Sequence, residues 1–353
     1  SSTDPHFYVF SPNLMIAAYT FDRLVNQDAN MNMKAGLAVS WKPVDDLTWE
    51  FKLREGVKWH DGSPFSAEDV EFSLKRAPNV PKSPSSFGRF VKQIKSIQII
   101  DPLTIHLKTG KPFPLMPAYL SVVPIVSKKN GEGANTKDYN TGKAMIGTGP
   151  FKIVEWVPGD RMVFERNDSY WDKKVAWEKI TFKPISNDSA RVAAMLAGDV
   201  DFIDLVPTSD INSFEKDPNI SVIQIVSNMM IYLHMDSNRD ISPFVTDKNG
   251  NPMKKNPLKD TRVRKAISKT INREAIVDRL MLGAAVPSSQ IMTEGGFAFS
   301  EKLKPEKYDT EGAKALLAEA GWEGGFGLTI HGPNDRYVND AKICQAIAQM
   351  LSR

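Results

Sequence analysis

Short stretches of alternating apolar and polar residues occur throughout the first half of the chain. Residues 48–54 show the pattern most clearly, because three apolar side chains alternate there with three charged ones: Trp49, Phe51 and Leu53 against Glu50, Lys52 and Arg54. A period of two indicates a strand with one buried face. Two later stretches each contain a turn pair, so we expect hairpins folded at Asp101-Pro102 and at Pro158-Gly159.

Other stretches carry apolar residues at helical spacing. Ser66 stands where it can cap a helix over residues 67–77, and two acids follow in the first turn, where the helix dipole favours them. Ser11, followed by Pro12, and Thr310 are placed to cap further helices. Besides 67–77, the pattern predicts helices over 12–25, 260–272, 273–282 and 310–320.

Residues 180–204 follow the order strand, helix, strand, with Gly198 placed to end the helix. Residues 227–238 are predicted to form one more strand. A strand–helix–strand unit joins parallel neighbours, because its crossover returns the chain to the same end of the sheet. The sequence therefore predicts a mixed α/β fold that includes a partly parallel sheet.

The last predicted helix has an apolar stripe at intervals of three and four residues: Ile343, Ala346, Ile347, Met350 and Leu351. Such a stripe needs a sheet to cover. No strand follows it before Arg353, so we interpret the chain as a fragment of a longer protein. The opening "SSTDPHF" leads straight into a loop, and we expect that an export signal has already been removed.

Length and composition limit the class of protein. The chain has 353 residues, which suits two or three domains, and its 41% hydrophobic and 25% charged residues are typical of a soluble globular protein. No apolar run approaches the roughly 18 residues that cross a bilayer. The net charge of +3 comes from 45 basic and 42 acidic residues that are interspersed, so we expect no nucleic-acid partner.

The residues that carry chemistry are sparse. Cys344 is the only cysteine, and we interpret it as a buried structural thiol; a single cysteine excludes an internal disulfide or a cysteine-based zinc site. His60 lies in a tight turn and is expected to hold backbone groups. Neither a histidine pair with metal-ligand spacing nor a nucleophile or phosphate-loop motif is present, so we expect no metal, no cofactor and no catalysis. The five histidines are His6, His60, His106, His234 and His331.

Five stretches in order along the chain resemble one family, the periplasmic solute-binding proteins of ABC importers in the peptide- and nickel-binding class (solute-binding family 5). The first is nearly identical to the family's most recognisable stretch. Five collinear matches are far more specific than one. They are "WEFKLREGVKWHDGSPFSAEDVEFSLKR", "IGTGPFKIVEW", "RNDSYWDKK", "DTRVRKAISKTINREAIVDRLMLGAAVPSSQ" and "YDTEGAKALLAEAGW".

The resemblance implies an α/β, two-lobed periplasmic-binding-protein type II fold with an extra inserted domain and mixed sheets, whose C-terminal part is missing from this chain. Domain I would comprise residues 1–36 and 148–239. Domain II would be an insert over 37–147, and domain III would begin at 240 and run, incomplete, to 353.

A loop between a predicted strand and the last helix carries Asn334, Asp335, Arg336 and Tyr337. Ligands of open α/β sheets bind beyond the strand ends, near helix N-termini. The guanidinium of Arg336 matches a carboxylate in a bidentate manner, and Tyr337 offers an apolar face with a hydroxyl. Dipeptide-binding family members carry Arg-Pro-Tyr in the matching loop, whereas this chain lacks the proline. The alternative is a solvated loop arginine.

The resemblance also nominates a loop at residues 7–15. Nickel-binding members have a similar run, which maps onto Tyr8, Asn13 and Met15 among others, and their tyrosine and methionine lie near the metal complex. Tyr8 and Asn13 are candidates for polar contacts. For Met15 the alternative is packing in the core, because it falls on the apolar face of the predicted helix.

Three further candidates complete the predicted ligand-binding set. Phe87 and Arg89, in "SSFGRF", map to another loop that lines the family's cleft. Tyr232 belongs to the predicted strand at 227–238, together with His234, and either residue could instead be packed in the core.

The leading functional hypothesis is a binding protein that captures short peptides in the cleft between its lobes and delivers them to the permease subunits of an ABC importer. A nickel chelate, an opine or glutathione remains an open alternative ligand. From other classes, a peptide hydrolase is disfavoured for want of a catalytic constellation, and a chaperone-like protein would bind no small ligand. We expect a monomer, located in the periplasm or tethered to the outer face of the membrane.

Overall fold

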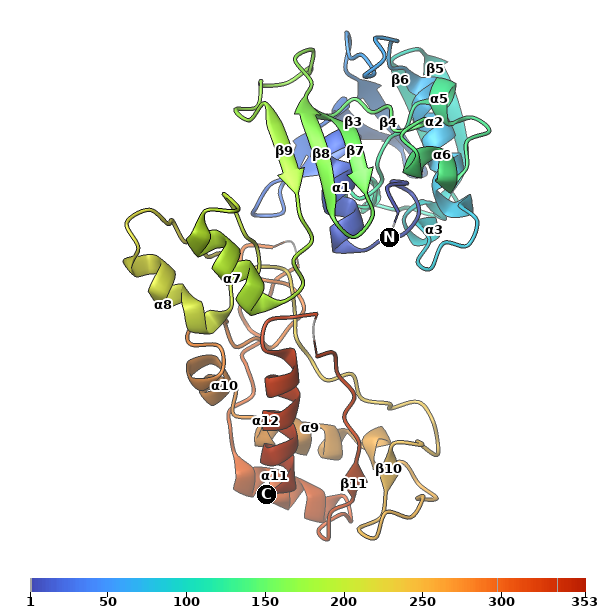
Figure 1. Cartoon of the computed structure of the whole chain (residues 1–353). Helices are drawn as coiled ribbons and strands as arrows, with labels where there is room; N and C mark the ends of the chain where they lie inside the picture. The colour runs from blue at the N-terminus through green and yellow to red at the C-terminus, as the bar shows by residue number, and fades with distance from the viewer. Residues whose placement is uncertain (1, 297, 335) are drawn as a thin grey trace. The chain divides into compact units, whose positions relative to one another are not determined.

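The computed structural model describes residues 2–296, 298–334 and 336–353 of the chain (Figure 1). The chain divides into two compact units, of which one ends at Pro184 and the other begins at Ile185. Each unit is described by itself. The three-domain division expected from the sequence, with boundaries after residues 36, 147 and 239, is finer than this and stays a prediction.

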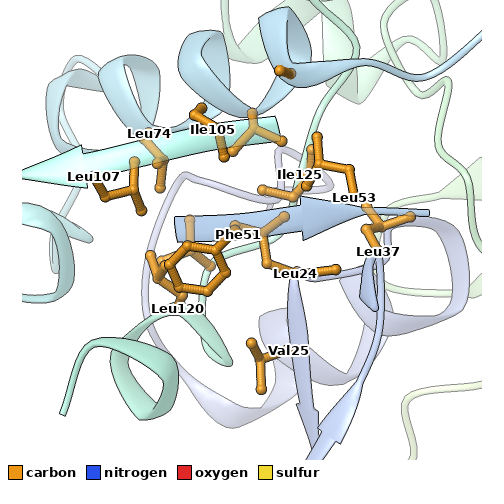
Figure 2. Close-up of a cluster of buried hydrophobic side chains, with 14 of the residues drawn as sticks. Leu24, Val25, Leu37, Phe51, Leu53, Leu74, Ile105, Leu107, Leu120 and Ile125 are labelled. Carbon is orange, nitrogen blue, oxygen red and sulfur yellow. The ribbon is translucent and has the colours of Figure 1, made fainter. Parts of the chain in front are cut away.

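The first unit contains a four-stranded antiparallel sheet in the order β3-β4-β6-β5. Its central strand β4 alternates as predicted, since Phe51 and Leu53 are buried while Lys52 is exposed. Figure 2 shows Leu74 of the neighbouring helix α2 pointing toward Ile105 and Leu107 of β6. The elements are β3 (Ala38–Asp45), β4 (Thr48–Leu53), α2 (Ala67–Arg76), β5 (Ile94–Asp101) and β6 (Thr104–Thr109).

Helix α2 begins where the sequence predicts. The Ser66 side chain accepts a hydrogen bond from the backbone of Glu68, and Asp69 in turn accepts one from the backbone of Ser66 at 2.9 Å. Short elements fill the rest of this part of the unit: β1 (Val25–Gln27), β2 (Met33–Ala35), η1 (Ala77–Asn79), α3 (Gly88–Val91), α4 (Met116–Leu120), α5 (Lys128–Gly131) and α6 (Thr136–Asn140).

A second antiparallel sheet consists of β7 (Phe151–Val157), β8 (Arg161–Arg166) and β9 (Lys179–Phe182), and the hairpin folded at Pro158-Gly159 is confirmed. Helix α1 (Ser11–Thr20) packs on it through Tyr19, whose ring lies 5.9 Å from that of Phe151 and 5.2 Å from that of Phe164.

The predicted extent and cap of α1 were wrong. Its N-cap is Phe10, so Ser11 already lies inside the helix, and the helix ends at Thr20 rather than continuing to residue 25. Residues 21–25 extend instead because Phe21, Leu24 and Val25 are buried in the core and Val25 begins β1.

The second unit is mainly helical. Val263 and Ile267 of α9 meet Ile343 and Ile347 of α12 in its core, so the apolar stripe of the last helix covers another helix rather than the expected sheet. Cys344 beside that stripe is only partly buried, which corrects the expectation of a buried thiol. The elements are α7 (Asp188–Ala197), α8 (Thr208–Lys216), β10 (Val245–Thr246), η2 (Pro257–Lys259), α9 (Thr261–Thr270), α10 (Arg273–Arg279), α11 (Thr310–Glu319), β11 (Gly327–Leu328) and α12 (Asp340–Ser352).

The predicted strand–helix–strand unit forms only in part. β9 and α7 are present, and Gly198 ends α7 with φ of 75°. Within the described residues, however, no strand forms over 200–204 or 227–238, and the ladders between named strands are all antiparallel. Phe202, in the first of these segments, is 78% exposed, and Tyr232, in the second, is 66% exposed. A strand needs a neighbour for its backbone hydrogen bonds, and the described residues supply none to these segments.

The helix starts of the second unit also differ in one detail from the prediction. Asp309, not Thr310, caps α11, because its carboxylate accepts the Gly312 N–H at 2.8 Å. Gly321 follows the helix with φ of 79°, as expected for a residue that ends it.

Candidate ligand-binding site

The predicted ligand-binding residues fall into both units, and the first group lies on a loop anchored by Asp4. This carboxylate is fully buried and receives both ends of the Arg76 guanidinium, at 2.9 and 2.7 Å. Thr136 donates a third hydrogen bond at 3.0 Å, and the backbone of His6 a fourth. Burial alone would raise the pKa of Asp4, but Arg76 holds it below its usual value.

His6 extends this network. Its Nε2 lies 2.8 Å from the carbonyl of Pro124, which can only accept, so Nε2 carries the proton; Nδ1 then accepts from Arg76 at 3.2 Å. Burial and the neighbouring Arg76 lower the pKa of His6 to about 4. The ring is therefore neutral near pH 7, and the network fixes the course of residues 4–6.

The anchored loop lies beside a second predicted loop. The backbone N–H of Val9 donates to the carbonyl of Ser85 at 3.0 Å, and Tyr8 forms an isolated parallel bridge with the same residue. The His6 ring meets the edge of Phe87, with centroids 5.6 Å apart. The structure thus brings together the two segments that the sequence nominated separately, residues 7–15 and 85–90.

The side chains in these two loops differ in what they can contact. Asn13 is buried and donates to the carbonyl of Tyr8 at 3.3 Å, and Phe87 has no exposed surface, so both support the loops from inside. Tyr8 is partly exposed, and Arg89 is exposed with its guanidinium 4.6 Å from the ring centroid of Phe90. Met15 is 39% exposed, so the alternative of core packing for this residue was wrong.

The "GTGPF" stretch has a structural role. His60 Nε2 donates to the carbonyl of Gly149 at 3.0 Å, and its Nδ1 accepts the Gly147 N–H at 3.2 Å, which confirms that His60 holds backbone groups. Burial lowers the pKa of His60 to about 4. A Cβ on Gly147 would collide with the backbone carbonyl of Thr20, so glycine is required by close approach.

The buried carboxylate of Asp22, which the sequence did not reveal, links the "GTGPF" stretch to the "RNDSYWDKK" stretch through hydrogen bonds. Asp22 accepts hydrogen bonds from Thr148 at 2.9 Å, from Tyr170 at 3.2 Å and from Trp171 Nε1 at 2.8 Å. Burial raises the pKa of Asp22, although the three donors oppose the shift. Asp22 has no local signal in the sequence, because its partners lie more than 120 residues away.

The second group of candidates lies on the loop before α12. Arg336 is exposed; its Nε donates to the Tyr337 hydroxyl at 2.8 Å, and its guanidinium carbon lies 5.1 Å from the ring centroid. The backbone N–H groups of Arg336 and Tyr337 both donate to Asp340 Oδ2, at 3.0 Å each. Asn334 is exposed, and Asp335 lies outside the described residues.

Tyr232, the remaining candidate, lies in the segment that was expected to be a strand. It is 66% exposed, and its ring centroid is 6.3 Å from that of His234, which is also exposed. The alternative that these two residues pack in the core was therefore wrong. Whether Tyr232 contacts a ligand stays a prediction.

Surface hollows occur away from these candidates. One hollow of about 340 Å³ in the first unit adjoins Trp59 and Lys128, and one of about 320 Å³ in the second adjoins Trp322 and Lys255. Neither is lined by a predicted ligand-binding residue. Among the described residues, no group of three or more histidine, cysteine or acidic side chains is placed to hold a metal ion.

Comparison with known proteins places the chain in a class. Residues 32–353 match the bacterial extracellular solute-binding proteins, family 5 Middle, and the chain belongs to this family. The predicted α/β fold class of the periplasmic-binding-protein type II kind is confirmed, because solved structures of this family superimpose on the chain. The partly parallel sheet is not part of that confirmation, since the named strands of the described residues pair only in antiparallel ladders.

Among individual relatives, the glutathione-binding protein GsiB of Escherichia coli K12 is 27% identical over all of this chain, which spans 65% of the length of that protein. NikZ from Campylobacter jejuni, solved in complex with Ni(L-His), is 30% identical with a TM-score of 0.73, covering 91% of this chain and 61% of NikZ. The periplasmic binding protein DppA from Helicobacter pylori, solved with the peptide STSA, is 25% identical with a TM-score of 0.72, covering 92% and 65%.

These relatives define the class at a general level, because the name or bound ligand of each marks a protein that binds a small molecule. DppA is in addition an ABC transporter-associated periplasmic binding protein. In the part of this chain that the structure describes, no helix is both long enough and apolar enough to span a bilayer.

Proposed function

We propose that the protein is the extracytoplasmic solute-binding component of an ABC importer, and that it captures short peptides and delivers them to a membrane permease without chemical change. The single observation that carries the choice of ligand is the loop before α12, where Arg336 and Tyr337 lie side by side with their backbone held by Asp340. Membership of solute-binding family 5 supports the role of carrier.

The proposed chemistry of capture is recognition of a carboxylate. A guanidinium pairs with a carboxylate through two parallel hydrogen bonds, and such charge-assisted bonds are roughly twice as strong as neutral ones. Tyr337 already orients the guanidinium, so less side-chain entropy is lost when a ligand binds. In the first unit, Tyr8 is partly exposed and Met15 and Arg89 are exposed, so these three are candidates for further contacts, while Asn13 and Phe87 shape the loops that carry them.

A nickel chelate is the second candidate ligand, and one observation favours it. Met15 is exposed rather than packed, so its side chain is accessible to a bound metal complex, and NikZ, 30% identical, was solved with Ni(L-His). Substitution of Met15 by Leu keeps the side-chain volume and removes the sulfur. A loss of Ni(L-His) binding in Met15→Leu with peptide binding unchanged would favour this candidate over the first.

The test is a thermal-shift screen followed by calorimetric titration of the hits. Peptide pools, glutathione, Ni(L-His) and opines are offered to the wild type and to Arg336→Ala, with Arg239→Ala as the control. Arg239 is also an exposed arginine of the second unit, paired with Asp236 at 3.5 Å. A ligand that binds only the folded state raises the melting temperature by mass action.

We expect a peptide to shift the wild type and the control, and to bind Arg336→Ala about tenfold or more weakly, the size of a charged hydrogen bond. A peptide that binds all three proteins equally would refute the role of Arg336. Turnover of a peptide by the pure protein would revive the hydrolase hypothesis, and no saturable binding of any ligand would favour the chaperone-like one.

The remaining parts of the proposal concern the whole protein. We propose a monomer in the periplasm, or tethered to the outer face of the membrane, that works with permease subunits and needs no cofactor. Residues 1–36 with 148–239, residues 37–147 and residues 240–353 are its proposed domains.

A further inference from the structure

Asn339, the residue that precedes α12, has an unusual backbone conformation for its position. Its φ of 57° and ψ of 21° are left-handed, whereas residues that cap helices normally have extended backbones. Asparagine is also among the best capping side chains, yet that of Asn339 makes no capping hydrogen bond. Few non-glycine residues adopt this region, and asparagine is among those that do so most readily, so the conformation suits a residue that turns the chain sharply before a helix.

The side chain of Asn339 is used elsewhere. Its Nδ2 donates to the hydroxyl of Thr208 at 2.9 Å and to the carbonyl of Leu280 at 2.9 Å. Thr208 is the buried first residue of α8, and Leu280 directly follows α10. One amide therefore ties the loop before α12 to the ends of two other helices.

Asp340 fixes the same loop from the other side. Its carboxylate is buried and accepts the backbone N–H groups of Arg336 and Tyr337 through one oxygen and that of Ala341 through the other. Burial alone would raise the pKa of Asp340, but these three donors hold it below its usual value. The carboxylate is consequently charged near pH 7, and the short segment from Arg336 to Asp340 forms a closed, hydrogen-bonded ring.

We infer that Asn339 and Asp340 are positioning residues for ligand capture: they hold Arg336 and Tyr337 in the one arrangement that accepts a ligand carboxylate. This inference rests on the proposed function, since it assigns these residues a part in the same site. Neither is expected to touch the ligand. The left-handed backbone of Asn339 and the absence of a capping hydrogen bond from its side chain both follow from this use of the residue to aim the loop.

The first test needs no ligand. Asn339→Gly keeps the left-handed backbone accessible and removes the amide, and Asn251→Gly is the matched control in another loop of the same unit, where Asn251 bonds Asp247. Hydrogen exchange of the segment 336–340 and the rate of tryptic cleavage after Arg336 are measured for each. We expect both rates to rise about tenfold in Asn339→Gly only. If Asn339→Gly does not fold, Thr208→Val is used in its place, because it removes one acceptor of the Asn339 amide at nearly constant side-chain volume.

The second test uses a double-mutant cycle with named probes. The peptide STSA, its C-terminal amide and glutathione are titrated into the wild type, Asn339→Gly, Arg336→Ala and the double variant. We expect Asn339→Gly to lower the affinity for a probe with a free carboxylate about threefold to tenfold and to leave the affinity for the amide unchanged. In the Arg336→Ala background, Asn339→Gly should cause no further loss of affinity.

Different outcomes separate the two proposals. Equal losses of affinity for the peptide and its amide, or a loss that adds fully to that caused by Arg336→Ala, would overturn the positioning role and leave the proposed function intact. If the wild type binds none of the three probes, the proposal that it captures such ligands is overturned. In that case unchanged exchange at 336–340 in Asn339→Gly overturns the inference, and raised exchange supports its structural part.

Discussion

Acidification from about pH 7.5 to pH 5.0 is expected to destabilise the first unit through two histidines, the buried His6 and the partly buried His60. His6 and His60 both have pKa values lowered to about 4, chiefly by burial, whereas an unfolded histidine titrates near 6.5. Between these values the unfolded chain binds more protons than the folded one. Stability is therefore fully present above pH 6.5 and is lost as the pH falls toward 4.

The size of the loss follows from the two pKa values. Integration of the proton linkage between pH 7.5 and 5.0 gives about 2 kcal/mol for each histidine, hence about 4 kcal/mol together, before opposing contributions from other groups. The structural basis is that each ring uses both nitrogens: His6 between Pro124 and Arg76, and His60 between Gly149 and Gly147. A second proton on either ring would remove one acceptor and leave a charge in a buried place.

The assay is urea unfolding at the two pH values, followed by tryptophan fluorescence. Six of the seven tryptophans precede residue 185, so the signal reports mainly on the first unit. His60→Asn should be less stable than the wild type at pH 7.5 but should lose about 2 kcal/mol less on acidification. Val57→Ala, which removes buried methyl groups and no titrating group, should keep the full wild-type loss. Equal losses in His60→Asn and the wild type would refute the reasoning.

Three further changes test other parts of the framework. Arg76→Met leaves the buried Asp4 carboxylate without its cation and should cost about 3 to 5 kcal/mol of unfolding free energy; adding Asp4→Asn should recover part of the melting temperature, and no recovery would contradict the pairing. Ser66→Ala should cost about 1 kcal/mol in urea unfolding, because it removes the cap of α2, and a neutral result would mean the cap is dispensable. Gly147→Ala should cost at least about 1 to 3 kcal/mol, since the new methyl meets the Thr20 carbonyl; a crystal structure with an unshifted backbone would contradict this.

The parts of the fold that the sequence predicted are those that local interactions decide. Strand β4 alternates within six residues, α2 carries its own cap and charges, and the hairpin at Pro158-Gly159 is closed by adjacent residues. The caps of α1 and α11 were each misplaced by one residue, but the larger errors concern distant partners. Residues 227–238 have the composition of a strand, but strand formation requires a neighbour, which no local pattern reveals.

In the candidate site, too, the features visible in the local sequence could be predicted and those that depend on distant residues could not. The loop before α12 could be selected from Arg336 and Tyr337, because their chemistry is visible in the sequence. The groups that hold the loops could not, since Asp4 meets Arg76 across 72 residues and Asn339 meets Thr208 across 131. Met15 illustrates the limit of periodicity, because it occupies an apolar position in a helix that covers the sheet with another face.

The stretches that carry the family resemblance prove to build the framework rather than the candidate site. Gly147 is fixed by its approach to Thr20, and Thr148, Tyr170 and Trp171 all converge on Asp22. A close backbone approach or a buried carboxylate tolerates very few residue types, so such positions give a family its recognisable sequence. A ligand contact requires only one suitably placed side-chain tip on a loop, which many residues can supply. This is why the class of this protein can be read from its sequence, whereas its ligand is identified by a binding experiment.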